Sequence, residues 1–147
     1  MWYRLSTVAV DLVELLQAQQ PVRLRKTAAE VARLAVQRTQ LIDLKIDSAL
    51  AAMHDGNFGD SDAHSAVEQL TKELDVIAWE LQKVAEENGS SMQPYYAAFA
   101  RARAAASVKC ALYSDPLSAA LEAVYEAQAA VIDLDAIRVS IDSSLAD

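Results

Sequence analysis

The chain has 147 residues, of which 53% are hydrophobic, and its formal net charge is −8. A chain of this length and composition can bury the core of one domain, so we expect residues 1–147 to form a single domain. The acidic balance argues against nucleic-acid binding, which normally requires a basic face.

Cysteine usage and hydropathy bear on where the protein works. Cys110 is the only cysteine, so no internal disulfide can form, as is usual in a reducing compartment. The apolar N-terminal stretch carries Asp11 and Glu14 and lacks a small-residue cleavage site, which argues against a signal peptide. No uncharged apolar run reaches the roughly 18 residues needed to span a membrane. We therefore expect a cytoplasmic protein.

Helix-forming residues dominate the chain, and three Gly and three Pro leave few positions for turns between strands. Apolar spacings of three and four residues predict five helices, the second starting between Pro21 and Thr27. Their expected limits are residues 5–19, 21 or 27 to 56, 61 or 65 to 89, 91 or 93 to 113, and 115–145. Short connections and the alternating charge of successive helices favour antiparallel neighbours. We predict an all-α fold, an antiparallel up-and-down bundle of four long helices plus a shorter N-terminal helix.

The third predicted helix has the clearest apolar periodicity. Its stripe resembles a coiled-coil seam, flanked at heptad spacing by Glu73, Glu80 and Glu87, and consists of Val67, Leu70, Leu74, Ile77, Leu81 and Val84. Trp79 points away from this stripe, with Val76 close by. We expect the stripe of the N-terminal helix to cover a surface that includes Trp79; otherwise Trp79 marks an interface with a partner or a second copy. The N-terminal stripe consists of Leu5, Val8, Leu12 and Leu15.

The polar segment of residues 54–64 contains the best candidates for a metal site, which are His54, Asp60, Asp62 and His64. The pattern does not fit a calcium loop, because the glycine is displaced and Ala66 stands where a bidentate Glu is needed. Neither histidine has a Glu three residues before it, which excludes a di-iron centre of the ferritin type. We expect an ordinary polar turn, with no metal and no cofactor.

No catalytic constellation is evident in the sequence. Cys110 lies in an Ala-rich segment, where a cysteine is usually a small core residue. Asp11 and Glu14 have the spacing of an acidic metal-binding motif, but no convincing second pair accompanies them. Glu122 and Glu126 are predicted to lie on a solvated acidic face. The protein is therefore more consistent with a non-enzymatic role.

Six residues are candidates for an interaction surface: Val76, Trp79, Tyr95, Tyr96, Arg101 and Arg103. Exposed Trp is typical of interaction hot spots, and the two arginines beside aromatic residues can bind an acidic partner or pair with acidic neighbouring helices. The leading hypothesis is a small acidic protein-interaction module, comparable to an immunity protein, a secretion chaperone or an adaptor. Its partner would be another protein or a second copy. The alternatives are a divalent-metal-dependent ligand-binding or hydrolytic bundle and a self-assembling structural bundle.

Overall fold

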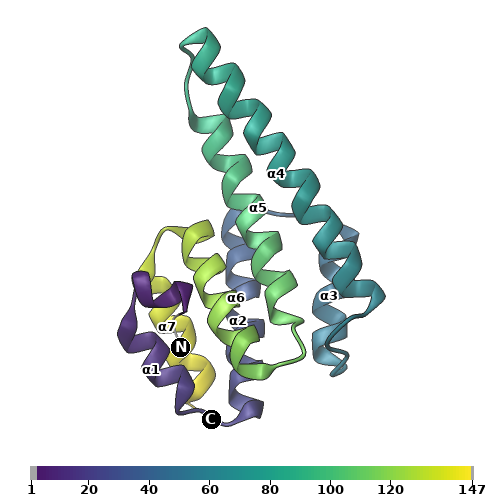
Figure 1. Cartoon of the computed structure of the whole chain (residues 1–147), viewed down its shortest axis with the longest axis vertical. Helices are drawn as coiled ribbons and strands as arrows, with labels where there is room; N and C mark the ends of the chain where they lie inside the picture. Colours follow the sequence, from purple (N-terminus) through teal and green to yellow (C-terminus); the bar gives the residue numbers. More distant parts are fainter. Residues whose placement is uncertain (1–2, 147) are drawn as a thin grey trace.

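The computed structural model describes residues 3–146, and within this range the chain is helical, without a β-strand (Figure 1). This confirms the all-α prediction. A short 3-10 helix, η1 (Arg4–Thr7), precedes seven α-helices. These are α1 (Val10–Gln17), α2 (Pro21–Thr39), α3 (Leu44–His54), α4 (Asp62–Asn88), α5 (Gln93–Ala111), α6 (Pro116–Val131) and α7 (Leu134–Leu145). Each of these helices is too short or too polar to cross a lipid bilayer.

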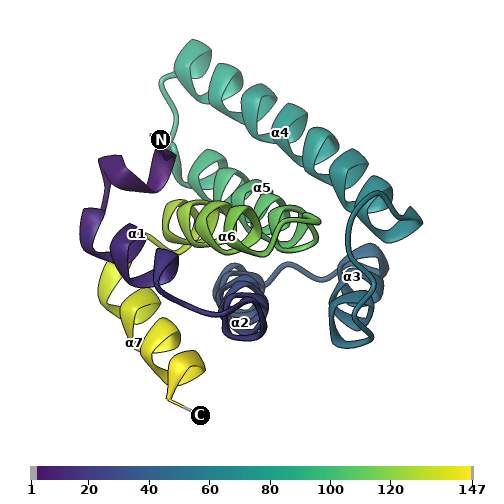
Figure 2. The ribbon, with the colours of Figure 1, turned by 60° about the horizontal axis from the view of Figure 1, so that its bottom comes forward.

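Helices α2, α5 and α6 form the centre of the molecule, with α4 and α3 on one side and α1 and α7 on the other (Figure 2). Most of the buried side chains of α5 and α6 are alanines, which let the helix backbones approach closely. The buried Ser107 hydroxyl of α5 donates a hydrogen bond to the Ala123 carbonyl of α6 over 2.8 Å. Between α2 and α7, the buried hydroxyls of Thr27 and Ser144 lie 2.7 Å apart. Small polar groups therefore join helices without leaving unpaired hydroxyls in the core.

Two of the predicted long helices are wrong in extent, because each is divided into two. The first break follows Gln40 and the second follows Val131, where Gln40 and Ile132 adopt left-handed backbone conformations. Aspartates cap the helices that follow, since Asp43 accepts a hydrogen bond from the Lys45 amide and Asp133 from the Ala136 amide. The tripeptide Ile-Asp-Leu occurs at both breaks, at residues 42–44 and 132–134. Both α2 and α6 therefore end without the Gly or Pro that usually marks the end of a helix.

Replacing Ile132 with Gly should stabilise the protein by about 1 kcal/mol, because a left-handed conformation costs a β-branched residue about that much. Ile132 has φ 53° and is 82% exposed, so the loss of its side chain removes little packing. Ile42→Gly is the matched control, because Ile42 is exposed and precedes Asp43 but has no positive φ. Urea denaturation should show a gain for Ile132→Gly and none for Ile42→Gly. Equal effects of the two substitutions would contradict the strain argument.

The N-terminal segment does not cover Trp79, so this expectation is wrong. Helix α1 and η1 pack on α6, far from the projecting tip of α4 (Figure 1), and bury Leu5, Leu12 and Leu16 there. Asp11 of α1 also forms an ion pair with Arg138 of α7. The spacing of the stripe identified an apolar face, but the position of the helix depends on which groove is open to it. The available groove is beside α6 and α7.

Candidate functional site

The end of the α4–α5 hairpin, residues 76–99, projects beyond all other helices (Figure 1). We call this segment the hairpin end. Gly89 terminates α4 with φ 61°, and Pro94 lies in the first turn of α5. Toward its tip, α4 and α5 lie beside each other and apart from the other helices (Figure 1), so side chains that face outward there are not covered by another helix. The exposed large apolar side chains here are Val76, Ile77, Trp79, Val84, Tyr96 and Phe99.

Most of the predicted interaction residues lie on the hairpin end. Trp79 is 61% exposed, Val76 54% and Tyr96 52%. Tyr95 is partly buried, with its ring centroid 5.5 Å from that of Tyr96 and 6.0 Å from that of Phe99. This arrangement holds an aromatic group in place on α5 at the surface of the molecule. Arg101, partly buried, lies just beyond this segment.

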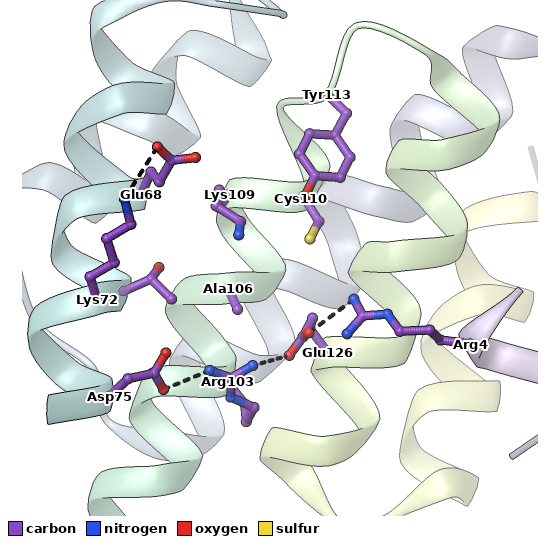
Figure 3. A pocket seen from close by; sticks show the side chains of 11 residues that line it. Arg4, Glu68, Lys72, Asp75, Arg103, Ala106, Lys109, Cys110, Tyr113 and Glu126 are labelled. Atoms are coloured by element: carbon purple, nitrogen blue, oxygen red, sulfur yellow. Dashed lines mark hydrogen bonds and ion pairs between the residues drawn. The ribbon is translucent and has the colours of Figure 1, made fainter. Parts of the chain in front are cut away.

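Arg103 belongs to a different feature, a polar cleft of about 330 Å³ between α4, α5, α6 and η1 (Figure 3). Here Arg103 donates hydrogen bonds to Asp75 of α4 over 2.6 Å and to Glu126 of α6 over 2.9 Å. Glu126 also pairs with Arg4 of η1 over 3.1 Å, and Arg4 pairs with Glu122. One chain of charges thus connects four elements. Of the two roles considered for Arg103, binding an acidic partner or pairing with acidic neighbouring helices, the structure shows the second.

Glu126 is only 3% exposed, so the prediction of a solvated acidic face is wrong for this residue. Burial alone would lower the pKa of Arg103, but the charges of Glu126 and Asp75 outweigh burial and raise that pKa above its ordinary value. The Nε atom of Arg103 is buried without a hydrogen-bond partner. The network therefore keeps its arginine charged at any physiological pH. Sequence reasoning missed it because its members lie far apart in the chain.

The cleft contains balanced charges rather than an activated nucleophile. The cleft is lined by four cations, Arg4, Lys72, Arg103 and Lys109, and by three carboxylates, Glu68, Asp75 and Glu126. A fourth carboxylate, Glu122, pairs with Arg4. Burial raises the pKa of the Cys110 thiol to about 11, so this cysteine is a protonated, 2% exposed core residue at neutral pH. Burial also raises the pKa of Tyr113 beside it. The ion pairs of the cleft join η1, α4, α5 and α6.

The four metal candidates do not come together. His54 borders a hollow lined by Arg25 and Phe58, whereas Asp60 and His64 border another beside Tyr113. Asp62 is the exposed first residue of α4. The residue before it, Ser61, caps this helix, and its hydroxyl accepts a hydrogen bond from the His64 amide over 3.1 Å. In residues 3–146, no three His, Cys, Asp or Glu side chains converge on a point where a metal ion could bind.

Comparison with models of protein families, with curated proteins and with solved structures finds no match to this chain. The hairpin end and the polar cleft are therefore interpreted from their own geometry and chemistry.

Proposed function

We propose that this protein is a non-enzymatic, cytoplasmic protein-interaction module that binds a partner protein through its hairpin end. Six of the thirteen exposed large apolar side chains of residues 3–146 lie in this 24-residue segment. Exposed apolar side chains that gather in one part of a monomeric protein are typical of an interaction site. Trp and Tyr, which Trp79 and Tyr96 provide here, are also the residues most enriched in interaction hot spots. The position of these residues at a projecting end is the observation that carries the proposal.

Proteins that act by occupying a surface of another protein, such as immunity proteins, secretion chaperones and adaptors, need such a surface and no catalytic group. The metal-dependent alternative has less support, since its candidate ligands lie in separate hollows. Self-assembly through the hairpin end is also less favoured, because α4 carries Glu80, Glu86 and Glu87 there against the single cation Lys83, and two copies would bring like charges together. A different protein is therefore the better partner.

The test is affinity capture from an extract of the native host, quantified by mass spectrometry, with three baits. The wild-type protein and a Val139→Ser control should retain the same partner, because Val139 is exposed on α7, outside the hairpin end. The double variant Trp79→Ala/Tyr96→Ala should lose that partner. Both variants remove exposed side chains, so neither should unfold. Equal recovery of every captured protein by all three baits would overturn the proposal.

A further inference from the structure

Three lines of residues along α4, each with members seven positions apart, differ in what covers them. Residues at this spacing lie on nearly the same side of a helix. Thr71, Ala78 and Ala85 form the buried line, with exposed fractions of 5%, 3% and 5%. Because α5 is the only helix beside α4 near the tip (Figure 1), the buried line marks the side of α4 that faces α5. Its small alanine side chains, Ala78 and Ala85, let the two helices approach closely toward the tip (Figure 1).

The second line, Leu70, Ile77 and Val84, is covered at one end only. Leu70 is 5% exposed, but Ile77 is 48% exposed and Val84 49%. Near the base of the hairpin, α3 packs beside the start of α4 (Figure 2). Beyond α3 nothing covers this line, which we call the open line. An apolar stripe with coiled-coil spacing thus continues for two heptads past the last helix that packs near it.

The third line is acidic and lies next to the open line. Glu73, Glu80 and Glu87 are all exposed, and each is three residues after a member of the open line. Within residues 3–146, neither Glu80 nor Glu87 takes part in an ion pair or a hydrogen bond through its side chain. In coiled coils, charges that flank the apolar seam determine which helix can pair. The acidic line therefore favours a helix that carries positive charge at the matching positions.

We propose that a basic amphipathic helix of a partner protein docks lengthwise on the open line and pairs its Lys or Arg side chains with the acidic line. This inference rests on the proposed function and specifies the chemistry of the partner. Ile77 to Glu87 spans about 15 Å, so a partner helix of about three turns covers the surface. A second copy of α4 fits less well, since antiparallel pairing would place Glu73, Glu80 and Glu87 opposite the same glutamates.

The probe is a synthetic three-heptad peptide with Leu and Ile on one face and Lys beside them, labelled for fluorescence anisotropy. Its counterpart carries Glu in place of Lys. The full-length wild-type protein should bind the basic peptide and not the acidic one. The variant Glu73→Lys/Glu80→Lys/Glu87→Lys should weaken binding of the basic peptide at least about tenfold, since the paired charges become repulsive. Ile77→Asp/Val84→Asp should abolish binding, and circular dichroism should show both variants folded.

General attraction between a basic peptide and an acidic protein is controlled by Asp47→Lys/Asp135→Lys/Asp142→Lys, which makes the same change in net charge at exposed sites on α3 and α7. This variant should keep wild-type affinity within about threefold. Equal weakening by the two charge-reversal variants would overturn the docking proposal. The proposed function would stand if native-partner capture depended on Trp79 and Tyr96 but not on the acidic line. It would fail together with the docking proposal if neither set of substitutions affected capture.

Discussion

Glu126→Ala should lower the free energy of unfolding by about 3–5 kcal/mol, the loss typical of removing one partner from a buried ion pair. Glu126 is 3% exposed and pairs with both Arg103 and Arg4. The Arg103 side chain, 20% exposed, would keep its charge but lose its inner carboxylate, whereas the more exposed Arg4 can remain on Glu122. The measurement is chemical denaturation followed by circular dichroism.

Two controls separate burial from charge pairing in general. Asp11→Ala breaks the ion pair with Arg138, which is largely solvated, and should leave the denaturation midpoint nearly unchanged. The double variant Glu126→Met/Arg103→Met should recover most of the lost stability, because replacing a buried ion pair with apolar side chains is often neutral. A loss below about 1 kcal/mol for Glu126→Ala, as for a surface pair, would show that the network does not stabilise the fold.

Helix content and most helix boundaries could be predicted because their signals are local. Ser61 caps the start of α4 and Gly89 caps its end. Asp115 caps the start of α6, and its carboxylate accepts a hydrogen bond from the Ser118 amide over 2.8 Å. The breaks after Gln40 and Val131 could not be placed from turn residues, since neither Gly nor Pro occurs there. The repeated Ile-Asp-Leu tripeptide was the available signal, because Asp is a strong N-cap residue.

The candidate surfaces could be predicted only where helix periodicity determines exposure. The position of Trp79 opposite the apolar stripe correctly indicated a side chain outside the core, and it is 61% exposed. Periodicity cannot show what packs over such a residue, which is why the N-terminal segment was expected there. The polar cleft depends on pairs between Arg103 and Glu126 and between Arg4 and Glu122, which are 23 and 118 positions apart. Their meeting is a consequence of tertiary packing.

The open line also gives a stability prediction, because equal positions in the heptad pattern have unequal burial. Leu70→Ala should lower the free energy of unfolding by about 2–5 kcal/mol, as for other truncations of buried leucines. Ile77→Ala should change it by less than about 1 kcal/mol, since half of the side chain is exposed and Ala is the better helix former. Urea denaturation of both variants, with equal m-values, measures the difference.

A comparable loss from Ile77→Ala would mean that the hairpin end is covered in solution, by a second copy or by another helix of the chain. Analytical ultracentrifugation of the wild-type protein distinguishes these two cases. The small loss of stability that we expect for Ile77→Ala would instead mean that the hairpin end is uncovered in solution. Ile77 and Val84 then contribute little to folding, although they continue the apolar spacing of Leu70. An exposed apolar stripe lowers solubility and adds little stability, so a stripe of this kind on α4 is the pattern expected of a surface that binds another helix.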